Sequence, residues 1–331
     1  MPRLRGMALL LFASVLTQSG TSWANNDPPQ DQNQSSHIAL VRAYALRDFH
    51  QSLLDRLSGS IVRRFPYRMV SDSKGRILVT DAGASLIHVF DVEHGVRSQI
   101  GGSSTHRLNF PGCIAVDAAD NVYVTDRGAR AVLVFNRDGR FLRTIGAGAL
   151  LVPTGLAVDK QSRTLYVADW LRGEILAFDL KGNFLHVIGG PGFGPGELYG
   201  AEDIILHQST LVVLDRFNYR FDIFDLQGQF LRASSFGLDQ MPVAFAFDGE
   251  GNLFYVDLDS GALVAVDPQG RILARTAQLP VFDQRSRPPL GVGFMCLATD
   301  LVGGILAVGP TLDIETLKVE ADKPNSISWL Q

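Results

Sequence analysis

The 331-residue chain contains only two cysteines, Cys113 and Cys296, so disulfide bonds are not what holds it together. A chain of this length buries enough apolar surface to fold without such links. The repeat described below places the two cysteines on sheets that are not neighbours. Their Cα atoms would then lie beyond the roughly 7 Å that a disulfide can span, and we expect two free thiols and no disulfide.

Charge is also sparse. Charged residues make up 19% of the chain and the formal net charge is −4, with no clustered basic stretch. This balance argues against nucleic acid as a partner, because such binding relies on lysines and arginines that neutralise phosphates. Hydrophobic residues reach 46%, with 33 glycines and 20 phenylalanines. That composition is typical of a packed, turn-rich β protein.

Familiar catalytic and metal-binding motifs are missing from the sequence. No two of the seven histidines have the H-x-x-x-H spacing, and there is no G-x-S-x-G elbow. The glycine-rich stretch 189–196 lacks the G-K-S/T of a phosphate-binding loop and leads into a predicted strand. The sequence therefore predicts no cofactor and no metal centre of a familiar type.

Long apolar runs are absent, and the N-terminus has a short one. Arg3 and Arg5 precede the apolar residues 7–15, a run too short to span a bilayer. Small residues follow at the positions that a signal peptidase reads, ending at Ala24. We predict a signal peptide over residues 1–24, cleaved after Ala24, and a periplasmic or secreted mature protein without a transmembrane segment. An uncleaved anchor is the alternative.

Three segments follow the predicted cleavage site. Residues 25–36 contain no aliphatic side chain and predict a flexible N-terminus. Residues 37–60 predict a strand, 38–45, and then one short helix capped by Asp48 and stopped by a glycine. The rest of the chain, 61–331, predicts a single repeat array.

One sequence motif recurs through this array. Residues 121–146 (NVYVTDRGARAVLVFNRDGRFLRTIG) alternate β-branched and aromatic residues with Asp/Gly turns, which predicts three antiparallel strands. Each unit adds an apolar first strand, and the period is 42–46 residues. Four strands at that period predict an all-β, six-bladed β-propeller. The aspartates that end the second strands mark the units: Asp81, Asp126, Asp169, Asp215 and Asp257.

The sixth unit lacks a fourth strand of its own. The spare strand 38–45 resembles the fourth strands of the other units, so we predict that the N-terminal strand completes the last blade and closes the ring. This arrangement hides two sheet edges. Closure by residues 326–330 from the C-terminus is the alternative.

The repeat resembles a known family. Residues 215–237 (DRFNYRFDIFDLQGQFLRASSFG) resemble the NHL pattern D-x-x-N-x-R-I-x-V-F-x-x-x-G-x-F, and residues 110–126 (FPGCIAVDAADNVYVTD) resemble its other half. Residues 189–198 are similar to the glycine-rich linker between NHL blades. The resemblance is to NHL-repeat propellers, exported bacterial ones in particular. It implies six blades, but the family includes binding modules, sensor domains and enzymes, so it does not choose a function.

The first candidate site lies on the loops between second and third strands, which crown one face of a propeller. Arginine and aromatic side chains gather there on blades 2 to 4, and this is the composition of a binding hot spot. We expect a binding or scaffold module for a protein, peptide or glycan. The alternative is that Tyr219 and Arg220 brace the blade. The candidate binding residues are Arg127, Arg130, Trp170, Arg172, Arg216, Phe217, Tyr219 and Arg220.

The second candidate site lies at the mouth of the central tunnel. Aligning the first strands places Arg68 opposite Asp203, with Glu202 beside it. The three residues are candidates for the site of a lyase or hydrolase, and the two acids are candidates for holding a cation. We favour the plainer interpretation, a charge pair that plugs the axis, and a protein whose main role is not catalysis. A structural component of an envelope assembly is a further alternative.

Overall fold

The computed structural model describes residues 36–44, 66–91, 93–102, 106–236, 240, 242–257, 262–275, 296–299, 305–308 and 314–321. Regular structure in these ranges is β-strand, apart from the 3-10 turn η2 (Arg216–Asn218). The contacts divide the chain into Met1–Asn33 and Gln34–Gln331, and every strand belongs to the second unit. The predicted signal peptide and the predicted helix after Asp48 lie outside the described residues.

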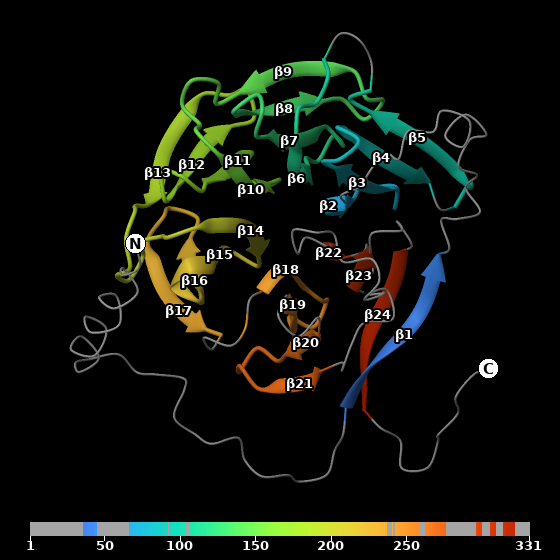
Figure 1. Ribbon diagram of the computed structural model, residues 1–331, viewed down its shortest axis with the longest axis vertical. Coiled ribbons are helices and arrows are strands. Elements are labelled where there is room, and N and C mark those ends of the chain that lie inside the picture. Colours follow the sequence, from blue (N-terminus) through green and yellow to red (C-terminus); the bar gives the residue numbers. More distant parts are fainter. Residues whose placement is uncertain are drawn as a thin grey trace, which may run out of the picture. The chain divides into compact units, whose positions relative to one another are not determined.

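The strands form six four-stranded antiparallel sheets, the blades of the predicted propeller (Figure 1). Blade 1 comprises β2 (Pro66–Ser71), β3 (Ile77–Asp81), β4 (Leu86–Asp91) and β5 (Val96–Ile100), and blade 2 comprises β6 (Pro111–Val116), β7 (Val122–Asp126), β8 (Ala131–Phe135) and β9 (Phe141–Ile145). Blade 3 comprises β10 (Pro153–Asp159), β11 (Thr164–Asp169), β12 (Glu174–Asp179) and β13 (Phe184–Gly189), and blade 4 comprises β14 (Ala201–His207), β15 (Thr210–Asp215), β16 (Arg220–Asp225) and β17 (Phe230–Ser235). Blade 5 comprises β18 (Pro242–Phe247), β19 (Leu253–Asp257), β20 (Leu263–Val266) and β21 (Ile272–Arg275), and blade 6 comprises β22 (Cys296–Thr299), β23 (Ile305–Val308), β24 (Ile314–Ala321) and β1 (Ser36–Tyr44).

The N-terminal strand closes the ring, as predicted. β1 pairs with β24 in antiparallel register from Ser36 opposite Ala321 to Tyr44 opposite Ile314. The first strands contact one another in order around the ring, and β22 contacts β2 to complete it. The two ends of the described propeller are therefore hydrogen-bonded together within one sheet, which removes the open edges of a linear array.

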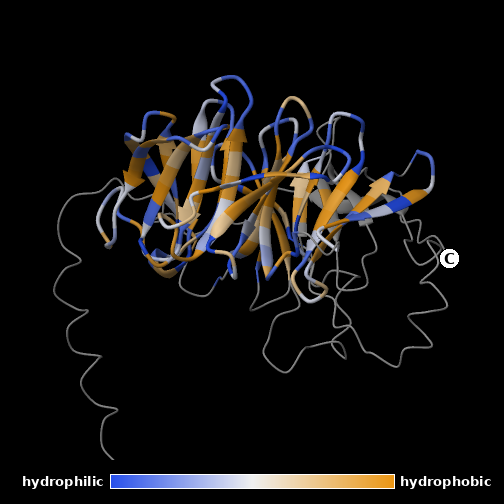
Figure 2. Ribbon diagram, turned by 90° about the horizontal axis from the view of Figure 1, so that it is seen from above, coloured by the Kyte–Doolittle hydropathy of each residue, from blue (hydrophilic) through white to orange (hydrophobic). Residues whose placement is uncertain are grey.

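Strand sequence follows position in the blade. The five residues of β7 and the five of β8 are all buried, since both faces of a middle strand pack against neighbouring blades. The outer strand β9 instead alternates partly buried and exposed residues. In Figure 2 most strands are hydrophobic, and many of the turns that join them are hydrophilic.

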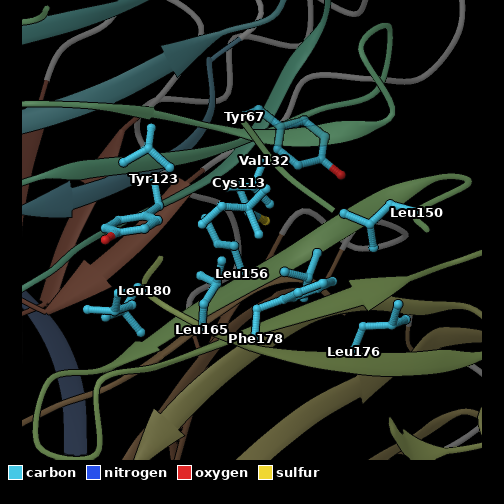
Figure 3. Packing of buried hydrophobic residues seen from close by; sticks show 14 residues of the cluster. Tyr67, Cys113, Tyr123, Val132, Leu150, Leu156, Leu165, Leu176, Phe178 and Leu180 are labelled. Atoms are coloured by element: carbon cyan, nitrogen blue, oxygen red, sulfur yellow. The ribbon is translucent and has the colours of Figure 1, made fainter. Parts of the chain in front are cut away.

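The core lies between blades. One cluster joins blades 1 to 3, and Figure 3 shows Tyr67, Cys113 and Tyr123 packed toward Leu156 and Phe178. A second cluster joins blades 3 and 4, and a third joins blades 4 and 5. Each blade thus buries both faces only when its neighbours are present, which is why the array folds as one ring.

Threonine hydroxyls add hydrogen bonds between neighbouring blades. The Thr80 hydroxyl donates to the carbonyl of Gly112 at 2.7 Å, from blade 1 to blade 2. The Thr125 hydroxyl donates to the carbonyl of Thr154 at 3.0 Å, and that of Thr154 to the carbonyl of Ala201 at 2.7 Å. These bonds hold the first strands side by side around the axis.

The recurring aspartate explains the positions of the loops. Asp126 accepts hydrogen bonds from the backbone N–H of Asn109 at 2.6 Å and of Ala129 at 2.9 Å. Asp126 therefore joins the linker that precedes blade 2 to the turn that follows strand β7. The aspartates of blades 3 and 4 accept the corresponding linker bonds, Asp169 from Leu151 and Val152, and Asp215 from Tyr199.

The turn after this aspartate has one backbone requirement. Its fourth residue adopts a left-handed conformation, with φ between +50° and +63° in blades 1 to 4. Only blade 3 has a glycine there, and the other three blades place a side chain in a region that L-residues rarely adopt. The four residues are Ser85, Arg130, Gly173 and Tyr219.

Gly155 allows blades 3 and 4 to approach closely near the axis. A Cβ atom built on this residue would lie 2.7 Å from the backbone nitrogen of Ile204 and 2.8 Å from the backbone of Asp203. Backbone atoms of a central strand cannot move aside as the end of a long side chain can. The first strand of blade 3 therefore has space for glycine only.

We predict that Gly155→Ala lowers the free energy of unfolding by about 1–3 kcal/mol, the usual range for overpacking a core. Urea unfolding followed by circular dichroism measures the loss. The matched control is Gly190→Ala, since a Cβ there would meet nothing within 4 Å. We expect that control to change stability by less than about 0.5 kcal/mol. Equal effects of the two substitutions would contradict the close approach.

Candidate functional site

Arg68 spans the tunnel mouth. Its Nε donates to Oδ2 of Asp203 on blade 4 at 2.9 Å, and its Nη2 donates to the carbonyl of Val243 on blade 5 at 3.1 Å. Its Nη1 donates to the carbonyl of Tyr67 on its own blade at 3.0 Å. One buried guanidinium therefore links blade 1 to blades 4 and 5 across the ring.

Asp203 is engaged on both carboxylate oxygens. Besides Arg68, it accepts hydrogen bonds at Oδ1 from the Cys113 thiol at 3.3 Å and from the backbone N–H of Ile204 at 3.0 Å. Burial raises the pKa of Asp203, and the charge of Arg68 opposes that shift. Burial, reinforced by the charge of Asp203, raises the pKa of Cys113 well above its ordinary value. Cys113 is free and buried, so it is a thiol donor and not a nucleophilic thiolate.

Glu202 lies between two arginines. Oε1 of Glu202 accepts a hydrogen bond from the Tyr67 hydroxyl at 2.9 Å, and Nη2 of Arg127 donates to that hydroxyl at 2.7 Å. Arg127 also lies 3.7 Å from Oε1, and Arg216 lies 3.8 Å from Oε2. Burial raises the pKa of Tyr67 well above its ordinary value, which keeps its hydroxyl a donor to the carboxylate. Two candidate binding arginines therefore belong to the tunnel-mouth network.

The acids of the tunnel mouth do not form a metal cluster. Among the residues that the structure describes, no group of three or more His, Cys, Asp or Glu side chains could hold a metal ion. A cation at Glu202 or Asp203 would meet the positive charges of Arg68, Arg127 and Arg216. The geometry suits a compensated charge network.

Arg220 holds the linker between blades 3 and 4. Its Nη1 donates to the carbonyl of Phe193 at 3.1 Å, and its Nη2 donates to those of Gly194 and Glu197, each at 2.7 Å. Its Nε donates to Oδ2 of Asp222 at 2.9 Å, and Nη2 lies 3.5 Å from Oδ2 of Asp215. Four of its five N–H donors are thus used within the fold, so the geometry makes Arg220 a brace.

The remaining candidates on the crowning turns differ in exposure. Tyr219 takes the left-handed turn position, and its ring lies 6.5 Å from that of Phe236. Arg172 donates from Nε to Glu174 at 2.7 Å and is partly exposed, whereas Arg130 is exposed. Trp170 and Phe217 are exposed as well. The structure brings Trp170 and Phe217 together, with ring centroids 6.1 Å apart.

Four exposed aromatic rings form one cluster on the turns and linker of blades 3 and 4. Adjacent ring centroids lie 6.1 Å apart for Trp170 and Phe217, 5.5 Å for Phe217 and Tyr199, and 5.0 Å for Tyr199 and Phe193. Their side chains are 38–71% exposed. We call these four residues the aromatic ridge.

Two of the four ridge residues were missed by the sequence analysis, which treated the glycine-rich segment as a linker only. Phe193 and Tyr199 lie within GGPGFGPGELYG, residues 189–200. The available signal was two aromatic residues surrounded by glycine and proline, with no alternating strand pattern to bury them. Such residues are exposed unless another element covers them.

Backbone contacts fix the ridge in place. The N–H of Phe217 donates to the carbonyl of Tyr199 at 3.1 Å, and the Asn218 side chain donates to the carbonyl of Gly192 at 3.0 Å. Gly200 has φ +92°, and a Cβ there would lie 2.5 Å from the Phe217 ring. The linker and the turn that carry the ridge are thus one packed unit.

The fold defines the class of this protein, a six-bladed β-propeller. The model of the family DUF5128, described as a 6-bladed beta-propeller, matches residues 155–267, which span blade 3 to blade 5. Protein brain tumor of Drosophila melanogaster is 30% identical over 128 residues, 38% of this chain and 12% of that protein. E3 ubiquitin-protein ligase NHLRC1 of Rattus norvegicus is 26% identical over 211 residues, 58% of this chain and 53% of that protein. The chain is a six-bladed β-propeller, and its sequence is similar to that of NHL-type proteins.

The chain spans about half or less of the length of these curated relatives. A solved streptogramin B lyase superimposes with a TM-score of 0.57 at 14% identity, covering 79% of this chain and 95% of that one. A nidogen/laminin complex gives a TM-score of 0.53 at 19% identity, with coverages of 66% and 87%. Identities this low show the fold alone. Within the described part of the chain, no helix has the length and apolar content needed to cross a membrane.

We predict that Arg68→Met lowers the free energy of unfolding by about 3–5 kcal/mol, because it leaves Asp203 buried without its cation. Adding Asp203→Asn restores part of the loss, since no charge then remains. Guanidinium unfolding measures both variants. The control is Arg271→Met, which removes an exposed guanidinium from Asp267; that carboxylate keeps the backbone N–H donors of Gln269 and Arg271, so the change costs less than about 1 kcal/mol.

The folding stability of the same variants should depend on pH in different ways. Because burial raises the pKa of Asp203, the folded state holds a proton that the unfolded chain releases near its ordinary pKa of about 3.9. The contribution of this group to stability is therefore largest at low pH and falls as pH rises through the raised pKa. The fall is largest in Arg68→Met, where the opposing charge is gone, and the double variant lacks the part that Asp203 contributes. Parallel pH profiles would refute the pairing.

Proposed function

We propose that this propeller is a binding module that holds a protein or peptide partner against the aromatic ridge. The observation that carries the proposal is the exposure of Trp170, Phe193, Tyr199 and Phe217 in one contiguous cluster. Clustered exposed aromatic side chains on a folded protein are typical of interaction sites, where they become the anchors of the interface.

The ridge is pre-organised for binding. Phe193 lies on a linker whose carbonyls are held by Arg220, and Tyr199 donates its N–H to Asp215 at 2.7 Å. Phe217 packs against Gly200 at the base of the same linker. A surface that is already ordered loses little conformational entropy when a partner binds, so more of the contact energy appears as affinity.

The charge around the ridge selects among partners. The described loops of this face carry five arginines, of which Arg127 and Arg216 are paired with Glu202 and Arg172 with Glu174, while Arg107 and Arg130 are exposed. The arginines are Arg107, Arg127, Arg130, Arg172 and Arg216. A partner segment that combines acidic with apolar side chains complements this face, since the arginines attract the acids and the rings receive the apolar groups.

Ring geometry favours a protein partner over a glycan. The neighbouring ring planes are inclined by 50–67° to one another, so the ridge has no broad flat platform for a row of sugar rings. Inclined rings instead make pockets between edges and faces that accept apolar side chains. A structure of similar fold is part of a nidogen/laminin complex, which is consistent with a propeller that binds protein.

The tunnel mouth supports a structural role better than catalysis. Arg68 donates to three acceptors, and Asp203 accepts from Arg68, Cys113 and a backbone N–H. Cys113 is held as a thiol by burial. A site whose polar groups are already satisfied by one another has little capacity to polarise a substrate. The lyase or hydrolase hypothesis therefore finds less support than binding.

The ridge is tested by a double substitution, Trp170→Ala with Phe217→Ala. We expect the proteins captured by immobilised wild type to be lost, and the affinity of a purified captured partner to fall at least about 30-fold, as for hot-spot anchors. Calorimetry or surface plasmon resonance measures the affinity. Circular dichroism checks that the variant remains folded.

The matched control is Leu231→Ser, which removes an exposed apolar side chain from the outer strand β17. It should leave the captured partner and its affinity unchanged. A partner that binds the double variant as well as the wild type would refute the ridge as the binding site. An affinity that falls as the salt concentration rises, and that is lower still in Arg130→Ala, would support an acidic partner segment.

We also propose export, with cleavage of the signal peptide after Ala24. The basic Arg3 and Arg5 ahead of the apolar residues 7–15 motivate the proposal. Expression of the full chain in a bacterial host, followed by fractionation, should give a periplasmic or secreted protein that begins at Asn25 by N-terminal sequencing. Leu10→Arg should retain the uncut chain in the cytoplasm. An uncut wild-type chain in the cytoplasm would refute export.

A further inference from the structure

One buried carboxylate oxygen has no donor. Asp222 lies on the middle strand β16, opposite Val213, and is fully buried. Its Oδ2 accepts a hydrogen bond from Arg220, but its Oδ1 has no hydrogen-bond partner. An ionised oxygen left without a donor in the interior of a blade carries a large desolvation penalty, so its protonation state needs a physical explanation.

The groups around Asp222 supply one positive charge, that of Arg220, against two buried carboxyl groups. Asp215, on the neighbouring strand, is close enough for a carboxyl-to-carboxyl hydrogen bond, and Arg220 is the cation that both acids share. On the linker, the Glu197 carboxylate is turned to the N–H of Gly194. The buried cluster between blades 3 and 4 is apolar, with Ala168, Ile175 and Ile188 from blade 3 and Leu198 from the linker. Two ionised acids would thus face one arginine.

Blade 1 shows how this position is satisfied. His88 stands seven residues after Asp81, as Asp222 stands seven after Asp215. Arg97 can only donate, so Nδ1 of His88 accepts its hydrogen bond at 2.6 Å, and Nε2 carries the proton toward Asp81 at 3.1 Å. A proton donor therefore faces the strand-ending aspartate of blade 1.

Blades 2, 3 and 5 have an aliphatic residue at the same position and no such donor. These residues are Leu133, Leu176 and Val264. A polar side chain at this position is thus the exception among the described repeats, and in blade 1 it supplies a proton to the aspartate. Asp222 can do the same only as a neutral carboxylic acid.

We propose that Asp222 is protonated and donates its proton to Asp215, and that this shared proton keeps Arg220 bound to the linker that carries Phe193 and Tyr199. The orphaned Oδ1 is then the hydroxyl of an acid. One negative charge on the pair matches the one positive charge of Arg220, which is free to donate to the carbonyls of Phe193, Gly194 and Glu197.

Loss of the proton loosens the linker. Burial raises the pKa of Asp222 to about 7; Arg220 opposes the shift, and the hydrogen bond with Asp215 adds to it. Above that pH two buried carboxylates compete for Arg220 and draw it from the linker carbonyls. The effect on binding rests on the proposed function of the ridge. The shared proton and the release of the linker do not depend on that function.

Infrared spectroscopy tests the proton directly. The difference spectrum of wild type minus Asp222→Asn at pH 6 should contain the carbonyl stretch of a protonated carboxyl, and the band should disappear as pH rises through about 7. Asp203, whose pKa burial also raises, contributes equally to both proteins and cancels. Asp138→Asn, at an exposed turn, should retain the full band. A difference spectrum without the band at pH 6 overturns the proposal.

Amide hydrogen exchange tests the release. The backbone N–H of Leu198 donates to the carbonyl of Gly190 within the linker, and that of Tyr199 donates to the carboxylate of Asp215. Their exchange rate in wild type, divided by that in Asp222→Asn, cancels the intrinsic effect of pH. We expect this ratio to rise by up to about tenfold per pH unit as pH approaches the pKa of about 7 from below, and to level off above it, because opening releases a proton only below that pKa. A ratio that is constant from pH 5 to 7 overturns the proposal.

A second variant distinguishes the loss of the shared proton from a folding defect. Asp222→Leu places in blade 4 the residue that blades 2 and 3 have, so it should fold and should also lack both the band and the pH-dependent exchange. No partner enters either measurement. A ridge that binds nothing would refute the proposed function and leave the shared proton intact, whereas a missing band would refute the proton alone.

Discussion

The hydrogen bonds accepted by one aspartate per blade are the contacts on which the loop face depends. Asp126, Asp169 and Asp215 each end a second strand, lie fully buried and accept N–H groups from the preceding linker. A buried carboxylate must have donors, and the linker supplies them. The linker and the crowning turn of a blade are therefore held together whatever side chains they carry, which leaves those side chains open to variation.

Blade 4 extends this arrangement. Arg220 and Asp222 surround Asp215, and the guanidinium continues to three linker carbonyls. The linker consequently presents Phe193 and Tyr199 beside Phe217 in a fixed geometry. The tunnel mouth uses its charges differently, because Arg68 joins blades across the axis and leaves few polar groups free. Arg68 thus serves the joining of blades, and Arg220 serves the presentation of the ridge.

Much of the fold could be predicted because a propeller repeats a local pattern. The period of the aspartates, the alternation within strands and the missing fourth strand of the last unit indicated six blades closed by the N-terminal strand, and the structure has both features. The candidate site was less accessible. Arg127, Arg216 and Arg220 looked alike on their turns, but their neighbours come from other blades and linkers, and these decide that each is already paired.

The sequence by itself determined the blade, since strand alternation and turn chemistry act over a few residues and recur in each copy. It also determined which side chains stand at equivalent positions, including His88 and Asp222. Only the tertiary structure decided what those side chains meet. Phe193 and Tyr199 join Trp170 and Phe217 because the linker folds back over blade 4. Asp222 and Asp215 share Arg220 because burial and strand pairing bring these groups together, and periodicity carries no information about such contacts.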